Sequence, residues 1–415
     1  MKRTALLLVC VLCCAAAVVL ASADSTGSAD AGAQLAQMTQ LPVLSIVTDD
    51  GKLPEDEMSY GQMTLYEDGG VRTVRVGLRL RGNTSRRFPK KSYRLIIVDE
   101  QGQKQNLSIG GLRSDDDWIL NPMYTDTSKI REKLAYELWD AMNSSGPKAQ
   151  SSRLVHAEIL LNGEYWGLYG VQERVDRKQV DADRRSGILY KVSRLEPPAV
   201  EELLVCEEEV CGGFELEFAG AGVDNAWEPA AAYMAYYHEQ ETDIRAVPDG
   251  NNLIDYGLWT MFTQAHDCHF KNQFIHGVYG PDGYTLYKIP WDVNNTFGDV
   301  WENDSPETNH TLFRIVDFTL DGIFELLVQA QDADVNAAIC RRWEQLRATV
   351  LKEELLLKRA HALYDPLYEA LERDSQRWPH SGMGDGNALN IGDIEEYIRA
   401  TLQDMDAYME GLKTE

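Results

Sequence analysis

The sequence predicts an α+β protein with a sheet-rich N-terminal lobe and a mostly helical C-terminal lobe. Strand-like alternation of apolar residues is concentrated before residue 193, whereas helical spacing dominates after residue 226. A polar segment, residues 266–298, lies within the part of the chain that has helical spacing. Runs of strands followed by runs of helices are typical of α+β chains, and the cleft between two such lobes is the expected place for a ligand site.

The composition narrows the choice of partner. The chain has 415 residues, which is enough to bury a large core in one or two domains. Its formal net charge of −26 excludes nucleic acid as an expected partner, because phosphate backbones are bound by basic surfaces. Cations or a basic protein substrate fit this charge better.

Residues 1–23 have the pattern of a secretion signal. Lys2 and Arg3 are followed by an apolar run over 5–20 and by the small residues of an A-x-A cleavage site at 21–23. The apolar run is long for a signal, so an uncleaved membrane anchor is the alternative. We therefore expect a secreted or cell-surface protein with no stable membrane span after cleavage.

The expected domain organisation follows from composition. Residues 24–40 are rich in Ser, Ala, Asp, Gly and Gln, which predicts a disordered linker. Residues 41–415 form the folded domain, with an N-lobe over 41–192, an acidic surface insertion over 193–225 and a C-lobe over 226–415.

The N-lobe pattern predicts strands and one helix. Asn162-Gly163 between two apolar runs is a strong hairpin signal. Apolar residues at helical spacing after a capping Asp-Thr-Ser predict a helix over 128–142. The strand candidates are 41–47, 63–80 as one strand, 153–161, 167–172 and 188–192.

The C-lobe pattern predicts helices around one hairpin. Two strands, 274–279 and 284–290, flank the turn Pro281-Asp282-Gly283. The helix candidates are 227–239, 253–264, 313–331, 333–374 with a break near Pro366, and 391–412.

Four cysteines remain after the N-terminal segment. In an oxidising compartment they allow three pairings, and Cys206 and Cys211 are predicted to pair because they are close in sequence. The other two are Cys268 and Cys340. Residues 24–415 contain no C-x-x-C or H-E-x-x-H motif, so a zinc site is not expected there.

A local basic cluster follows the strand that ends near Arg81. Gly and small polar residues form a turn, and Arg86, Arg87, Lys90 and Lys91 crowd it. Such a turn can present backbone N–H groups and cations to a phosphate. The alternative is a solvated basic hairpin.

Three polar residues surround the C-lobe hairpin. Asp267 and Asn272 have the spacing D-x-x-x-x-N, and Asp292 follows the second strand. Phosphoryl transfer to a hydroxyl needs an Asp for the acceptor, and an Asn and an Asp for Mg²⁺. We expect Asn272 and Asp292 at opposite ends of one small sheet, from where they converge on one cation. The alternative is a set of polar turn residues.

Five motifs in order carry a family resemblance. They are R-G-N-T-S-R-R-F-P-K-K-S-Y-R-L, D-W-I-L-N-P-M-Y-T-D-T-S-K-I-R-E-K-L-A, L-N-G-E-Y-W-G-L-Y-G-V-Q-E-R-V-D, D-x-x-x-K-N and I-P-W-D-V-N-N-T-F-G. The chain resembles the CotH kinase family, the spore-coat protein H family of atypical protein kinases, over about residues 41–380.

The resemblance implies a divergent bilobal protein-kinase-like fold. It also implies an ATP-dependent transferase that uses Mg²⁺ or Mn²⁺ and phosphorylates Ser residues of a protein. Because the chain is strongly acidic, we expect that protein to be basic as well as Ser-rich. By the same resemblance, Asp267 is the catalytic Asp, and Asn272 and Asp292 bind the metal.

The resemblance also assigns residues to the nucleotide. The turn from Arg81 to Arg86 stands for the phosphate-covering loop, and Lys90 or Lys91 for the strand lysine, a choice that alternation leaves open. Glu173 is placed at the interlobe hinge. The acidic partner of the lysine is either Glu173 or, on the 128–142 helix, Glu132.

Some ordinary kinase features are missing. The chain has no G-x-G-x-x-G, and no Arg separates His266 from Asp267. The rival hypothesis is a non-catalytic kinase-like surface, matrix or adhesion protein. A third is a nucleotide-dependent enzyme that modifies something other than Ser.

Overall fold

The chain folds into two compact units that share its length in alternating segments. The computed structural model describes residues 25–82, 84–194, 196–239, 248–268, 270–299, 322–329, 331–379 and 391–413. Unit 1 comprises Met1–Pro122, Leu154–Glu173 and Leu367–Ser381; unit 2 comprises Met123–Arg153, Arg174–Pro366 and Gly382–Glu415. The boundary therefore differs from the contiguous lobes predicted from the sequence. The expected signal, residues 1–23, lies outside the described residues.

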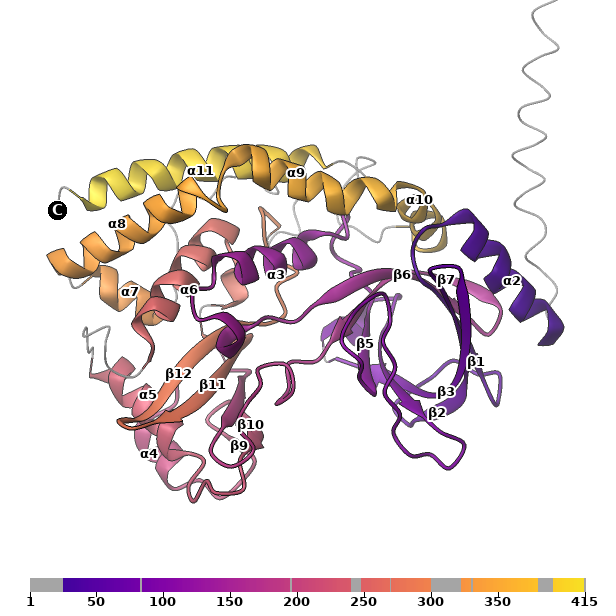
Figure 1. Cartoon of the computed structure of the whole chain (residues 1–415), viewed down its shortest axis with the longest axis horizontal. Coiled ribbons are helices and arrows are strands. Elements are labelled where there is room, and N and C mark those ends of the chain that lie inside the picture. Colours follow the sequence, from indigo (N-terminus) through magenta and orange to yellow (C-terminus); the bar gives the residue numbers. More distant parts are fainter. Residues whose placement is uncertain are drawn as a thin grey trace, which may run out of the picture. The chain divides into compact units, whose positions relative to one another are not determined.

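Unit 1 is built around a closed barrel, visible where the strands curve round in Figure 1. The strand order is β1-β2-β3-β4-β5-β7-β6, and β1 closes the barrel by pairing in parallel with β6. The other neighbouring pairs are antiparallel. The strands are β1 Val43–Thr48, β2 Ser59–Glu67, β3 Gly70–Arg81, β4 Ser92–Val98, β5 Asp117–Asn121, β6 Leu154–Leu161 and β7 Glu164–Glu173.

The alternating stretch 63–80 is two strands rather than one. β2 and β3 form a hairpin that turns at Asp68 and Gly69, both with positive φ. The Asp-Gly pair is a hairpin-turn signal, but alternation continues on both sides of it and hides the reversal. The prediction of a single strand was wrong here.

The segment expected as a disordered linker is helical in the structure. α2, Ser25–Met38, packs on the barrel, where Leu35 forms a buried cluster with Val43 and Leu160. Gly32 allows this approach, because a Cβ there would lie 2.9 Å from the Tyr66 ring. A helix of small residues with weak propensity is stabilised mainly by such tertiary packing.

A helix from near the end of the chain completes unit 1. α10, Tyr368–Arg377, lies against β7. The Arg373 guanidinium makes two parallel hydrogen bonds, of 2.8 and 2.9 Å, to the fully buried Glu158 carboxylate. Bidentate pairs of this kind fix orientation as well as adding energy.

Unit 2 contains a five-stranded sheet of order β12-β11-β8-β10-β9. Its strands are β8 Ile188–Val192, β9 Val210–Cys211, β10 Phe214–Ala219, β11 Gln273–Gly280 and β12 Gly283–Pro290. The acidic segment 193–225 was predicted as a surface insertion. Most of its described residues are exposed or half-buried, and β10 from this segment pairs with β8, so the segment also extends the sheet.

The helices of unit 2 follow the predicted positions with two differences. A turn after residue 348 splits the 333–374 candidate before its predicted break near Pro366, and residues 313–321 of another candidate are outside the described part. The α-helices are α3 Arg131–Met142, α4 Val200–Leu204, α5 Glu228–His238, α6 Gly250–Thr263, α7 Gly322–Gln329, α8 Ala333–Ala348, α9 Glu353–Tyr364 and α11 Gly392–Leu412. Short 3-10 turns are η1 Thr84–Arg87, η2 Gly146–Ala149, η3 His266–Cys268 and η6 Asp365–Leu367.

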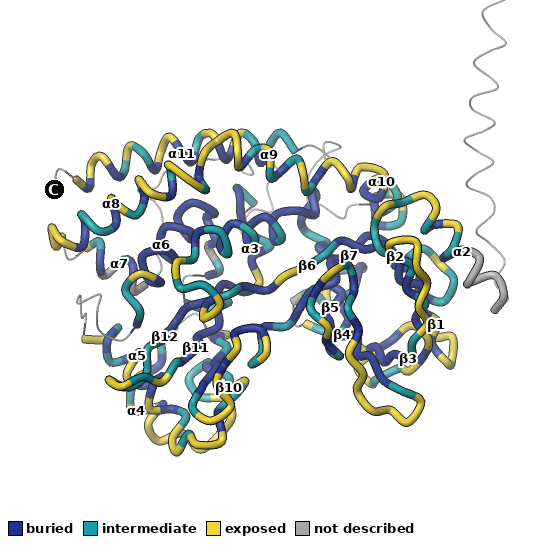
Figure 2. The backbone as a smooth tube through the Cα atoms, viewed as in Figure 1, coloured by how far each residue is buried: buried dark blue, intermediate teal, exposed yellow. Residues whose placement is uncertain are grey.

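Helix α6 is the central helix of unit 2. It contacts α3, α7, α8, α11 and β12, and Figure 2 shows it almost entirely buried. Gly257 on α6 accommodates the Phe324 ring of α7, since a Cβ there would lie 2.2 Å from the ring. The turn η3, which contains Asp267, follows shortly after α6 in sequence, so the buried helix fixes the start of this turn.

The predicted pairing of Cys206 with Cys211 is confirmed, and the second bridge that four cysteines would allow does not form. Cys206 and Cys211 form a disulfide, whereas Cys268 and Cys340 are free and buried. Within the described ranges, no helix has both the length and the apolar character needed to cross a bilayer.

Candidate functional site

The β11–β12 hairpin brings Asn272 and Asp292 to one end of the sheet. Asn272 immediately precedes β11, Trp291 follows β12, and the Trp291 N–H donates to the Asn272 carbonyl at 3.0 Å. The expectation that the two polar residues lie at opposite ends of the sheet was therefore wrong. They share the open end, opposite the turn at 281–282, because a hairpin returns the chain to its starting point.

Both residues have a backbone conformation that is unusual outside glycine. The φ angles are 54° for Asn272 and 56° for Asp292. A non-glycine residue held in such a region costs about 1–3 kcal/mol and persists only where its surroundings fix it. Both backbone N–H groups are hydrogen-bonded: Asn272 N–H donates to the Val192 carbonyl at 2.9 Å, and Asp292 N–H donates to the Tyr136 side-chain hydroxyl at 3.1 Å.

Tyr136 links this end of the hairpin to helix α3. Its hydroxyl accepts from Asp292 N–H and donates to the Glu132 carboxylate at 3.0 Å. Burial, together with the negative charges of Glu132 and Asp292, raises the pKa of Tyr136 well above its ordinary value. The phenol therefore stays protonated and keeps its role as donor to Glu132.

Asp267 lies in the turn η3, after α6, with an accessible carboxylate. Its side chain is 41% exposed and lies 3.1 Å from the Lys271 ammonium. The neighbouring Cys268 is buried, and its thiol lies 3.6 Å from the Trp291 carbonyl. Burial, followed by the negative charges of Asp267 and Asp292, raises the pKa of the Cys268 thiol, so this thiol is a poor nucleophile.

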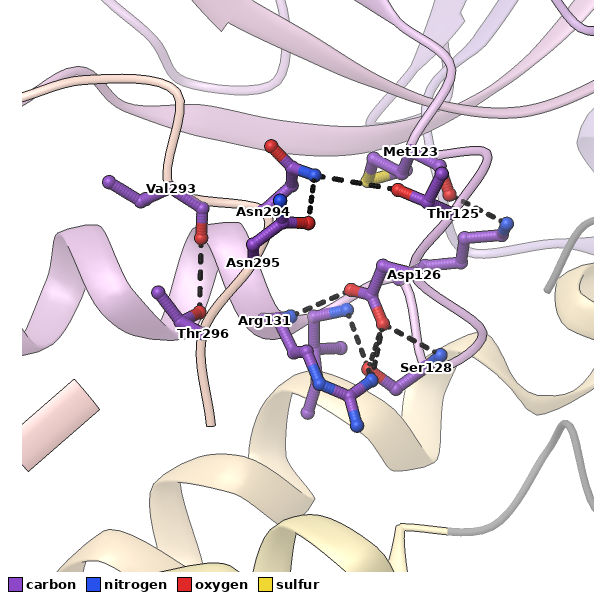
Figure 3. Close-up of polar contacts among 11 residues, drawn as sticks. Met123, Thr125, Asp126, Ser128, Arg131, Val293, Asn294, Asn295 and Thr296 are labelled. Carbon is purple, nitrogen blue, oxygen red and sulfur yellow. Dashed lines mark hydrogen bonds and ion pairs between the residues drawn. The ribbon is translucent and has the colours of Figure 1, made fainter. Parts of the chain in front are cut away.

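The loop after Asp292 is held by side-chain amides and hydroxyls (Figure 3). The Asn294 amide donates to Thr125 Oγ1 at 3.4 Å and to Asn295 Oδ1 at 2.7 Å. The Thr296 hydroxyl donates to the Val293 carbonyl at 3.0 Å. These bonds tie the loop to the segment that leads into α3.

A buried acid–base network begins α3, also in Figure 3. The Asp126 carboxylate accepts from the Arg131 backbone N–H at 2.9 Å and from its guanidinium at 2.7 Å. Burial opposes ionisation, but Arg131 and Ser128 outweigh it and lower the pKa of Asp126. Nearby Asp299 differs: burial and the charge of Asp126 raise its pKa to about 6 although Arg131 opposes this.

The two candidate lysines of unit 1 have different surroundings. Lys90 has no exposed surface; its ammonium lies 2.6 Å from the Leu168 carbonyl, 2.7 Å from Asp374, and 4.6 Å from the centre of the Tyr169 ring. In this conformation Lys90 is a core residue of unit 1. Lys91 is partly exposed, and its ammonium donates to the Arg86 carbonyl at 2.6 Å.

The remaining nucleotide candidates also lie in unit 1. Arg86 is exposed and pairs with Asp56 at 2.5 Å, and Arg81 is the last residue of β3. Glu173 ends β7 at the point where the chain leaves unit 1, and its buried carboxylate accepts from the Arg113 N–H at 2.9 Å.

The donor set at the hairpin fits a hard cation. One carboxylate (Asp292) and one amide (Asn272) are oxygen ligands of the kind that Mg²⁺ takes together with phosphate oxygens. Across the described residues, no group of three or more His, Cys, Asp or Glu side chains forms a metal cage. This set suits a metal that arrives with a phosphate-bearing substrate.

Comparison with known protein families identifies the family to which the chain belongs. The family profile described as "CotH kinase protein" matches residues 78–405. Because this match covers most of the chain, the protein belongs to the CotH kinase family. A search of curated proteins finds no match. Membership makes the chain a kinase-like protein, and protein kinases in general use ATP, a divalent metal ion and a protein substrate.

Sequence reasoning missed two residues with clear structural roles. Tyr136 stands four positions after Glu132, a spacing that places both on one helix face and could have signalled their contact. Asp374, the partner of Lys90, has no comparable signal, because it lies 284 residues further along the chain.

Proposed function

We propose that the protein is an atypical kinase that transfers the ATP γ-phosphoryl group to Ser residues of a basic protein substrate. The observation that carries this proposal is the meeting of Asn272 and Asp292 at the open end of the β11–β12 hairpin. Both have left-handed backbones, and the accessible Asp267 lies in the adjoining turn.

Each residue has one role in the proposed reaction. Asn272 and Asp292 would hold a Mg²⁺ or Mn²⁺ ion through their side-chain oxygens, and the ion would supply positive charge to the nucleotide phosphates. Asp267 accepts a hydrogen bond from the Ser hydroxyl and orients it toward the phosphorus. As the new oxygen–phosphorus bond forms and the bond to ADP breaks, the hydroxyl proton passes to Asp267.

Lys271 and the basic turn provide positive charge. The Lys271 ammonium lies 3.1 Å from the Asp267 carboxylate and can contact the transferred phosphoryl group. In unit 1, Arg81, Arg86 and Lys91 are the proposed phosphate contacts. Lys90 is the weaker candidate for a phosphate contact, because it is fully buried and paired with Asp374.

Export is part of the proposal. The Cys206–Cys211 disulfide is typical of an oxidising compartment, which agrees with the signal-like residues 1–23. The negative net charge favours a basic acceptor, and we propose that this acceptor is Ser-rich and lies at the cell surface or outside the cell.

The direct test is transfer of label from γ-labelled ATP to a Ser-rich basic protein, with Mg²⁺ or Mn²⁺. We expect label on Ser with the wild type and none with Asp267→Ala or Asp292→Ala. Asp282→Ala is the matched control, since Asp282 is exposed in the turn at the far end of the same hairpin. Transfer that survives Asp292→Ala, or a wild type that transfers nothing, contradicts the proposal and favours a non-catalytic binding protein.

A further inference from the structure

The direction of the Asp292 carboxylate depends on an unfavourable backbone conformation. With φ at 56°, Asp292 has a backbone conformation that Asp tolerates better than most non-glycine residues but that is still less favourable than negative φ, so hydrogen bonds at its backbone stabilise it. The Asp292 backbone N–H donates a hydrogen bond to the Tyr136 hydroxyl, 3.1 Å away. The conformation of Asp292 is thus coupled to a residue of helix α3.

Tyr136 is well suited to hold a backbone N–H group. It is 2% exposed, so water does not compete for its hydroxyl. By donating to the Glu132 carboxylate, the phenol becomes a stronger acceptor toward Asp292 N–H, because successive hydrogen bonds polarise one another. Phenylalanine would fill the same space but could neither donate nor accept.

The helix that carries Tyr136 is itself anchored to the same loop within unit 2. The segment before α3 is fixed by Asp126, which binds the Arg131 backbone and guanidinium. Thr125 in that segment receives the Asn294 amide from the loop after Asp292. Because these contacts restrict movement of the start of α3, the Tyr136 hydroxyl stays at hydrogen-bonding distance from the Asp292 N–H.

We propose that Tyr136 is a positioning residue that holds Asp292 in its left-handed conformation, with Glu132 orienting the Tyr136 hydroxyl. This inference rests on the proposed role of Asp292 as a metal ligand. Tyr136 does not touch metal or substrate; it acts through the Asp292 backbone. Any displacement of α3 would then weaken metal binding without changing either ligand.

The test compares Tyr136→Phe with Tyr190→Phe. Tyr190 is a buried tyrosine of the same unit whose hydroxyl donates to the Ala226 carbonyl, so its variant controls for loss of a buried phenol. The first readout, independent of activity, is hydrogen exchange in the peptide spanning 291–298. We expect faster exchange at the Asp292 amide in Tyr136→Phe and no change there in Tyr190→Phe.

The second readout is the Mn²⁺ concentration that gives half-maximal phosphate transfer. Loss of one buried hydrogen bond predicts a rise of roughly tenfold in Tyr136→Phe, with little change in the KM for the protein acceptor. Unchanged exchange at Asp292, or an unchanged metal requirement, overturns the positioning role. If the wild type transfers no phosphate but exchange responds as expected, the proposed function fails while the Tyr136–Asp292 coupling stands.

Discussion

At the scale of single residues, Lys90 and Lys91 are adjacent in sequence but differ in burial. Both are lysines at the start of one strand, and alternation along that strand cannot tell which is buried. The structure buries Lys90 against Asp374 and leaves Lys91 partly exposed. The distinction depends on a helix far along the chain, so no local pattern could have predicted it.

The two lysines should respond differently to loss of charge. Lys90→Met leaves the Asp374 carboxylate buried without its cation, which should lower the free energy of unfolding by about 3–5 kcal/mol. Lys91→Met should change it by about 0.5 kcal/mol or less, as exposed sites usually do. Urea unfolding of both variants measures the difference. Normal stability of Lys90→Met combined with lost ATP binding would instead assign Lys90 to the nucleotide.

Asp299 predicts a pH dependence of stability. Its folded-state pKa of about 6 is above the ordinary 3.8, so the folded protein binds the extra proton between these values. The contribution of this group is therefore favourable at low pH and is lost as the pH rises through 6. Asp299→Asn should gain stability relative to the wild type between pH 4 and pH 7.5, measured by urea unfolding. A constant difference across this range would show that Asp299 titrates normally.

The candidate site was partly predictable at the residue scale. The turn Pro281-Asp282-Gly283 predicted the hairpin, and a hairpin brings Asn272 and Asp292 together whatever else surrounds it. The left-handed backbone of both residues and the Tyr136 contact were not predictable, because they depend on packing between α3 and the hairpin loop. The catalytic and metal roles stay predictions.

At the scale of elements, prediction succeeded where the apolar pattern was strong. Helices α3, α5, α6 and α11 lie close to their expected positions, because their apolar residues recur at helical spacing. The failure at α2 has the opposite cause. Its small and polar residues resemble a linker, and the barrel surface supplies the stabilising contacts.

Leu35 tests whether α2 is part of the fold. Leu35 is 8% exposed and packs with Val43 and Leu160, so Leu35→Ala should lower the free energy of unfolding by about 2–3 kcal/mol. Gln37→Ala on the exposed side of the same helix is the control. Denaturant unfolding of both variants gives the comparison. Equal stability of the two would restore the linker interpretation.

At the scale of the whole molecule, the main finding is the interleaving of two units. The chain leaves unit 1 after Pro122, returns over Leu154–Glu173, and returns again over Leu367–Ser381. The sequence predicted the α+β class. It did not predict the alternation of the units, because a pattern of strands followed by helices favours two lobes that are each continuous in sequence. When the chain comes back to a unit after many residues, the spacing of apolar residues does not reveal it.

Interleaving predicts that the expected N-lobe is not a folding unit. A fragment of residues 41–192 lacks α10, so Lys90 and Glu158 lose the partners that satisfy them, Asp374 and Arg373. It also retains pieces of unit 2 without the strands that pair with β8. We expect no cooperative thermal transition by circular dichroism. A sharp transition together with dispersed amide resonances would show an independent domain.

The measurement that tests the central claim most directly is calorimetric titration of ATP into the wild type and into Asp292→Ala, with and without Mg²⁺. The account predicts ATP binding by the wild type that requires Mg²⁺ and is lost or weakened at least about tenfold in Asp292→Ala, since a metal-held carboxylate contributes at least about 1.4 kcal/mol. Binding that is equal in both proteins, or indifferent to Mg²⁺, would contradict a metal site at the open end of the β11–β12 hairpin.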